Sequence, residues 1–144
     1  MTNWKKVVVG VDGSEESQHA LAWAAEEAWT HGSGLTVLTA WSPPVVLVGP
    51  GYAAYPQHAE SDFSSAMQSG QDAAIEAVLG ADPDLRVNRV LVEGSAAPRL
   101  IAASAGADLV VVGSRGHGAF AGMLLGSVSQ HVTAHATCPV VVVR

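Results

Sequence analysis

The sequence has 144 residues, of which 49% are hydrophobic and 14% charged, so it can bury the core of one domain and is far from a disordered composition. Its formal net charge is −6, and its seven Lys and Arg residues are scattered along the chain. Nucleic acids and anionic membranes bind clustered cations, so both classes of partner are excluded. We expect one domain over residues 1–144.

The cysteine content and the N-terminal residues exclude further classes of protein. Cys138 is the only cysteine, which excludes an internal disulfide and a cysteine-based zinc site. Met1–Lys6 is polar, and the apolar run Val7–Val11 that follows is too short for a signal-peptide core or a membrane span. We therefore expect a cytoplasmic protein.

The first half of the chain alternates between strand and helix patterns. A β-branched run predicts a strand over Lys6–Val11, and apolar residues at helical spacing predict a helix that begins near Glu15 and ends before Gly32. A second strand is predicted over Leu35–Trp41. The Pro/Gly-rich stretch Ser42–His58 is expected to be a loop.

The second half continues this alternation. One face of a second helix is expected to carry Phe63, Met67, Gly70, Ala74, Ala77 and Val78. The elements expected after it are a strand over Arg86–Glu93, a helix over Ser95–Ala105, a strand over Leu109–Gly113, a helix from near Gly126 and a strand over Val140–Val143.

This order predicts an α/β fold, a single doubly wound five-stranded parallel sheet with helices on both faces. The strands are apolar throughout rather than alternating, as in sheets covered on both sides, and parallel crossovers are right-handed. Ligands of such sheets bind at the carboxyl ends of the strands, where the strand order reverses. The residues just after each strand are therefore the candidates for a site.

A glycine-rich segment follows the fourth strand. Gly113-Ser114-Arg115-Gly116 is separated by nine residues from Gly126-Ser127-Val128-Ser129. We expect Gly113 to leave space over the sheet, Gly116 to take a left-handed turn and Gly126 to open a helix with free amides. Amides at a helix N-terminus suit phosphates. Singly these could be ordinary loop glycines, but their joint spacing favours an anion site.

Other motifs are weaker or missing. No Gly-Lys-Ser/Thr occurs, so the chain has no P-loop. His131 and His135 have the spacing of zinc ligands but lack the Glu of a zinc protease, so surface or helix-capping roles are favoured. Asp12 is a candidate either for a ligand contact or for a plain helix cap.

The glycine spacing resembles the ATP signature of the universal stress protein family: glycine, two residues, glycine, nine residues, glycine and Ser or Thr. Val7–Ser14 resembles the family's opening strand and Asp-containing turn. Val92-Glu93-Gly94 and Cys138–Val143 also match, so the resemblance spans essentially the whole chain. It implies an adenine nucleotide α-hydrolase-like fold and ATP as the ligand.

The resemblance also implies roles for single residues. Val11 and Asp12 would lie near the ribose and adenine, and Ala40 against the base, with Val112 and Gly113 beside the nucleotide. The residues implied on the phosphates are Gly116, Gly126, Ser127, Val128 and Ser129. Arg115 and His117 are the cations near the phosphates, too few to balance a triphosphate, so Mg²⁺ is expected.

The functional interpretation is an ATP-binding sensor or regulatory module in stress response. No positioned acid–base pair or P-loop lysine is visible, so strong phosphoryl-transfer catalysis is not expected. Two alternatives stay open: a slow ATPase or an enzyme that autophosphorylates on Ser127, Ser129 or Ser114, and an interaction module with an empty nucleotide site.

An apolar final strand also predicts self-association. Val140–Val143 is short and apolar and would lie at an edge of the sheet. Such an edge tends to pair with another chain, and a two-fold axis makes that pairing self-complementary. We therefore expect a homodimer joined through this strand, and the family resemblance implies the same.

Overall fold

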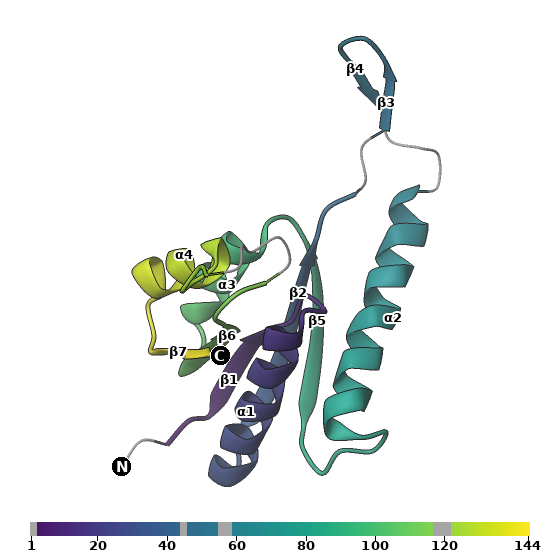
Figure 1. Cartoon of the computed structure of the whole chain (residues 1–144). Coiled ribbons are helices and arrows are strands. Elements are labelled where there is room, and N and C mark those ends of the chain that lie inside the picture. The colour runs from purple at the N-terminus through teal and green to yellow at the C-terminus, as the bar shows by residue number, and fades with distance from the viewer. Residues whose placement is uncertain (1–2, 44–45, 55–58, 117–121) are drawn as a thin grey trace.

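The computed structural model describes residues 3–43, 46–54, 59–116 and 122–144 (Figure 1). Its strands are β1 (Lys6–Gly10), β2 (Gly34–Trp41), β3 (Val46–Gly49), β4 (Tyr52–Ala54), β5 (Val87–Glu93), β6 (Leu109–Gly113) and β7 (Val140–Val143). Its helices are α1 (Glu15–His31), α2 (Ala59–Leu79), α3 (Ala96–Ser104) and α4 (Ser127–His135).

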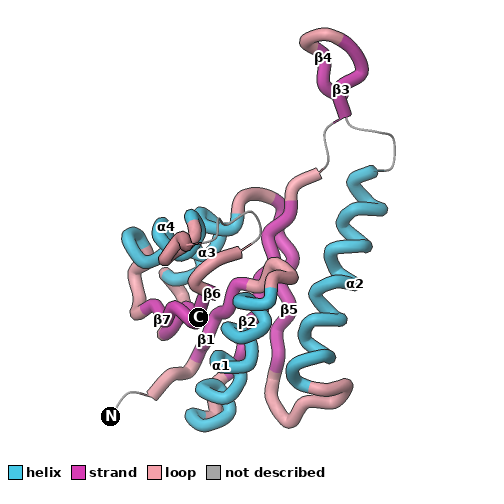
Figure 2. The backbone as a smooth tube through the Cα atoms, in the orientation of Figure 1, coloured by secondary structure: helices cyan, strands magenta, loops and turns pink. Residues whose placement is uncertain are grey.

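Five parallel strands form the central sheet in the order β5-β2-β1-β6-β7 (Figure 2). The chain moves from β1 outward to β2 and β5, then returns to the other side of β1 for β6 and β7. The strand order therefore reverses between β1 and β6, and ligands of doubly wound sheets bind at such a point. The predicted five-stranded parallel α/β fold is confirmed.

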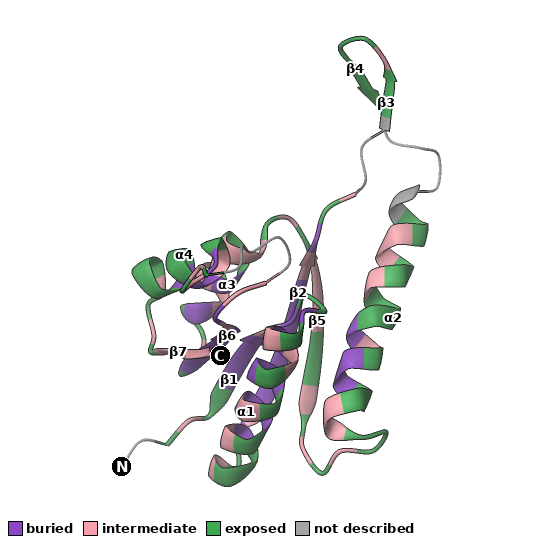
Figure 3. Ribbon diagram, viewed as in Figure 1, coloured by how far each residue is buried: buried purple, intermediate pink, exposed green. Residues whose placement is uncertain are grey.

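Helices cover both faces of this sheet. On one face the odd-numbered valines of β1 pack against Ala20, Leu21 and Ala24 of α1 and Ile75 of α2. On the other face Val8 packs in a cluster with residues of α3 and α4. Figure 3 shows the buried residues on the central strands and on the inner faces of the helices. A valine-rich central strand is buried on both faces because helices cover both sides.

None of the helices in the described parts of the chain is long and apolar enough to cross a membrane.

The expected loop over Ser42–His58 contains a hairpin. Strands β3 and β4 pair antiparallel, with a register shift between Leu47 and Gly49, and Gly51 has a φ of 78° in the turn. The hairpin extends beyond the rest of the molecule in Figure 1, and Leu47 and Tyr52 are exposed. The loop prediction is wrong here because Pro and Gly marked a turn between two short strands, not a continuous loop.

The predicted inner face of α2 is also wrong in part. Gly70 and Ala77 are exposed, whereas Gln71 and Ile75 are buried. The amide nitrogen of Gln71 donates to the carbonyl oxygens of Val37 and Val90, at 3.2 and 3.0 Å. A buried polar side chain with satisfied hydrogen bonds is compatible with the core, and an apolar pattern alone does not detect it.

Candidate functional site

A pocket of about 290 Å³ opens where the carboxyl ends of β1 and β6 meet the first turn of α4. The structure brings all eleven residues predicted for the site to its wall: Val11, Asp12, Ala40, Val112, Gly113, Arg115, Gly116, Gly126, Ser127, Val128 and Ser129. His117, the other cation expected there, lies outside the described residues. The binding roles of the eleven stay predictions.

The turn after β1 holds Asp12 at the pocket through the start of α1. The Oδ1 atom of Asp12 accepts hydrogen bonds from the amide and the hydroxyl of Ser14, at 2.9 and 2.5 Å. Ser14 is the N-cap of α1, and its hydroxyl accepts from the Ser17 amide at 3.2 Å. The N-cap of the helix is thus Ser14 and not Asp12. The Asp12 carboxylate instead holds the capping residue through hydrogen bonds.

The backbone of Val11 is engaged within the protein. Its amide donates to the carbonyl of Leu38 at 3.0 Å, and its carbonyl accepts from the Thr39 hydroxyl at 2.9 Å. Since alternate residues of a strand direct their backbone groups to the same side, those of Ala40 are directed as Leu38's are, toward the β1 side. Ala40 lies on the pocket wall, and its amide and carbonyl are directed toward the side of β1, which ends at Gly10.

The loop after β6 is fastened to the first turn of α4. The Ser114 carbonyl accepts hydrogen bonds from the Gly126 amide at 2.6 Å and the Ser129 hydroxyl at 2.8 Å. The Gly126 amide is therefore not one of the free amides expected where this helix begins, because it closes the loop. In a helix whose N-cap is Gly126, the amides of Ser127, Val128 and Ser129 have no intrahelical acceptor.

Each of the three signature glycines lies where a neighbouring part of the protein approaches closely. An added Cβ would lie 2.9 Å from the Glu16 carbonyl carbon at Gly113 and 2.5 Å from Oδ2 of Asp12 at Gly116. At Gly126 it would lie 3.3 Å from the Cα of Arg115. Each glycine therefore lets a neighbouring segment of the protein approach closely.

The left-handed turn expected at Gly116 is found elsewhere. Gly116 is not among the glycines with positive φ, whereas Gly122, later in the same connection, has a φ of 86°. The packing of Asp12 against Gly116 explains the need for glycine without any special backbone conformation.

Charge at the pocket is not net positive over the described residues. Arg115, expected to face phosphates, donates from Nη2 to Oε1 of Glu16 at 3.1 Å. Both side chains are partly buried, with exposed fractions of 38% and 25%. The other charged residue on the described pocket wall is Asp12. A ligand with several negative charges therefore needs backbone amides or a cation to balance them.

Two other groups of predicted residues can be located. No cluster of three or more His, Cys, Asp or Glu within the described chain could hold a metal ion. His131 and His135 are exposed on α4, as expected for surface histidines, and Nδ1 of His131 pairs with the Ser127 carbonyl at 2.8 Å. Of the candidate phosphorylation sites, Ser114 and Ser129 are buried and Ser127 is exposed.

Sequence reasoning missed part of the pocket wall. The residues missed are Gly10, Ser14, Ser17, Leu38, Ala96, Leu100 and Met123. Leu100 of α3 lies over β1, where a Cβ on Gly10 would be 2.9 Å from its Cδ1. Their positions in the sequence could have indicated these residues. Ser14 and Ser17 lie at the start of the helix after β1, and Ala96 and Leu100 lie on one face of the helix after β5.

Comparison with known proteins gives one family. The profile of the Universal stress protein family matches residues 3–144. Universal stress protein Rv2005c of Mycobacterium tuberculosis is 42% identical over 141 residues, which cover 96% of this chain and 45% of that protein. A universal stress protein of Thermus aquaticus is 35% identical over 144 residues, covering 98% and 99%. The chain thus spans about half the length of the mycobacterial relatives it matches first.

Solved structures give the same fold. Universal stress protein UspA from Lactobacillus plantarum superposes with a TM-score of 0.74 at 20% identity, covering 100% of both chains. A universal stress protein in complex with cAMP superposes with a TM-score of 0.60 at 28% identity, covering 99% of this chain and 98% of that one.

Proposed function

The chain belongs to the universal stress protein family, and on that premise we propose that it binds ATP in the pocket at the β1–β6 switch point as a cytoplasmic sensor or regulatory module. The observation that carries the proposal is the meeting of three groups in that pocket. These are the Asp12 carboxylate, the backbone of Ala40 and the first turn of α4.

Each part of an adenine nucleotide has a matching group in this pocket. The Ala40 amide and carbonyl match the acceptor and donor on the edge of adenine, and Leu38 and Leu100 supply apolar wall. Asp12 offers a carboxylate to the ribose hydroxyls. The amides of the first turn of α4, at the positive end of its dipole, suit the phosphates.

We also propose that Mg²⁺ binds together with ATP. Asp12 is the carboxylate among the described pocket residues, and Mg²⁺ in nucleotide sites commonly binds one or two carboxylates together with substrate phosphates and water. The described residues contain no group of three or more His, Cys, Asp or Glu that could hold a metal ion. Asp12 would therefore be its protein ligand, and the ion's chemistry there is neutralisation of phosphate charge.

A relative supports the class of ligand. The universal stress protein that is 28% identical was solved in complex with cAMP, which is an adenine nucleotide. Transferred to this chain, that supports recognition of adenine and ribose, while the number of phosphates is part of the proposal.

The proposal can be tested by removing one amide without removing the helix. Ser127 is the first residue of α4, where proline is well tolerated, and Gly126 before it is already extended at φ −79° and ψ 172°. Ser127→Pro removes the amide and the hydroxyl, and its matched control Ser127→Ala removes only the hydroxyl. Loss of a charge-assisted hydrogen bond should weaken ATP binding about tenfold or more in Ser127→Pro relative to Ser127→Ala, as measured by titration calorimetry. Equal affinities would overturn the phosphate assignment.

We also propose a homodimer formed through β7. The sheet has two edge strands, and β5 carries the exposed charges Arg89 and Glu93, which discourage pairing, whereas β7 is Val140–Val143. Its four valines are only half-buried in the single chain. Light scattering should give a dimeric mass that Val141→Lys reduces to a monomer. A monomeric mass for the wild type at micromolar concentration would contradict this.

A further inference from the structure

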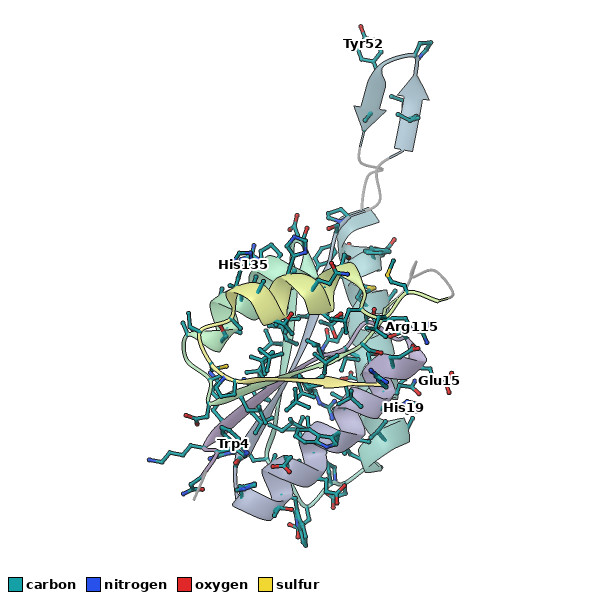
Figure 4. The ribbon with its side chains drawn as sticks, turned by 60° about the vertical axis from the view of Figure 1, so that its left-hand side comes forward. Trp4, Glu15, His19, Tyr52, Arg115 and His135 are labelled. Atoms are coloured by element: carbon teal, nitrogen blue, oxygen red, sulfur yellow. The ribbon has the colours of Figure 1, made fainter. Side chains whose placement is uncertain are left out.

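We propose that Glu16 sets the charge preference of the nucleotide pocket by competing with phosphates for Arg115. The inference rests on the proposed nucleotide binding. It names the residue that makes the affinity for a nucleotide depend on the nucleotide's charge. Figure 4 shows Arg115 beside the N-terminal end of α1, the helix that carries Glu15 and Glu16.

The position of Glu16 beside Arg115 is fixed by the packing of its backbone. It lies in the first turn of α1, whose N-cap Ser14 is bound to Asp12. The backbone of Glu16 packs closely against the end of β6, since a Cβ added to Gly113 would lie 2.9 Å from the carbonyl carbon of Glu16. From this position Oε1 accepts from Nη2 of Arg115 at 3.1 Å. A bound phosphate must therefore share Arg115 with Glu16 or displace it.

The net charge of the side chains at the pocket should affect nucleotides of different charge differently. Asp12 and Glu16 contribute two carboxylates and Arg115 one guanidinium, so these three side chains carry one net negative charge. The repulsion from that charge grows with each added phosphate charge, and partial burial limits its screening by water. ATP without Mg²⁺ is therefore opposed most, followed by ADP, AMP and cAMP.

A purely structural role for the ion pair makes a different prediction. If Glu16 served only to join α1 to the loop after β6, then removing its charge would change thermal stability and weaken all nucleotides alike. A role in charge selection changes the ratio of affinities instead. The readout is therefore the ratio of the ATP to the cAMP dissociation constant, not either constant alone.

The experiment uses Glu16→Gln, which keeps the shape of the side chain and a hydrogen-bond acceptor for Arg115. Binding of cAMP, AMP, ADP and ATP is titrated in EDTA at low salt. We expect the affinity for ATP to rise about fivefold and that for cAMP less than about twofold, with ADP and AMP between them in charge order. The gain for ATP should shrink at high salt.

Three controls make the result decisive. Glu15→Gln changes the neighbouring carboxylate, which is 83% exposed and paired with His19, and should leave the ratio unchanged. Glu16→Asp keeps the charge and should keep the wild-type ratio. In an Arg115→Gln background only the direct repulsion by Glu16 remains and no guanidinium is released, so Glu16→Gln should raise the affinity for ATP less than it does beside Arg115.

The role of Glu16 and the proposed function would be contradicted by different results. Equal changes for all four nucleotides, or a larger gain for cAMP than for ATP, would overturn the role of Glu16. A folded wild-type protein that binds none of the four would overturn the proposed function itself.

Discussion

Replacing Gly116 with alanine tests the contact that shapes the proposed nucleotide site. A Cβ at Gly116 would lie 2.5 Å from Oδ2 of Asp12, whereas ordinary van der Waals contact begins at 3.4 Å. The carboxylate must therefore retreat by about 0.9 Å, or the loop must move by as much. Because the clash is with a side chain, the protein can fold, but Asp12 cannot keep its position.

The cost follows from what holds Asp12. Its Oδ1 atom accepts two hydrogen bonds from Ser14, at 2.9 and 2.5 Å, and a movement of this size breaks or weakens at least one of them. These two bonds are internal to the protein, so their loss lowers its stability. The loss of affinity comes instead from the proposed hydrogen bonds of Asp12 to the ribose hydroxyls, since a hydrogen bond to a charged group contributes about 1.5–3 kcal/mol. We expect Gly116→Ala to weaken ATP binding about tenfold or more, since 1.4 kcal/mol corresponds to a factor of ten.

The assay is titration calorimetry with ATP, together with urea denaturation to establish that the variant is folded. Gly106→Ala is the matched control, because a Cβ there meets nothing within 4 Å and its φ is not in the left-handed region. Wild-type ATP affinity in folded Gly116→Ala would refute the argument that Gly116 keeps the Asp12 carboxylate in place for the ligand.

Three further predictions concern stability. In Gly113→Ala the new Cβ meets the backbone of α1, which cannot rotate away, so the free energy of unfolding in urea should fall by about 1–3 kcal/mol. Gly70→Ala lies exposed inside α2 with no neighbour within 4 Å, so unfolding in urea should require about 0.5–1 kcal/mol more. Hydrogen bonds from the amides of Lys5 and Lys6 hold the pKa of Asp108 below its ordinary value. A carboxyl with a lowered pKa stabilises the fold above its unfolded-state pKa and loses this as pH falls through the folded one. Asp108→Asn should therefore be less stable than wild type at pH 7, and the difference should shrink at pH 3.

The five parallel strands could be predicted from the sequence because each strand has a local sequence pattern. Valine runs such as Val7–Val9 and Val140–Val143 have no alternation, so they indicate strands covered on both faces, and helical patterns between them require parallel connections. The pocket followed from the same topology. All eleven predicted residues lie at the carboxyl end of a strand, in the turn after it or at the start of a helix, and these positions meet at one end of the sheet.

The interactions around those residues could not be predicted, because they depend on side-chain directions. No periodicity shows that Gln71 is buried with its amide on strand carbonyls, or that Glu16 meets Arg115 across 99 residues of sequence. The hairpin of β3 and β4 could not be predicted for another reason. Its strands are shorter than the windows over which a period can be recognised.

The glycine signature separates into two physical functions, and two variants can distinguish them. Gly113, Gly116 and Gly126 each allow a protein segment to approach, so their substitution acts on the ligand only through displaced neighbours. The amides of Ser127, Val128 and Ser129 act on the phosphates directly in the proposed site. Ser127→Pro should therefore lower ATP affinity with little change in the urea midpoint, because proline suits the first position of α4. Gly113→Ala should lower the midpoint first, because its Cβ meets the backbone of α1. If both variants lost affinity and stability in the same proportion, the glycines and the amides would form one cooperative unit and this separation would be wrong.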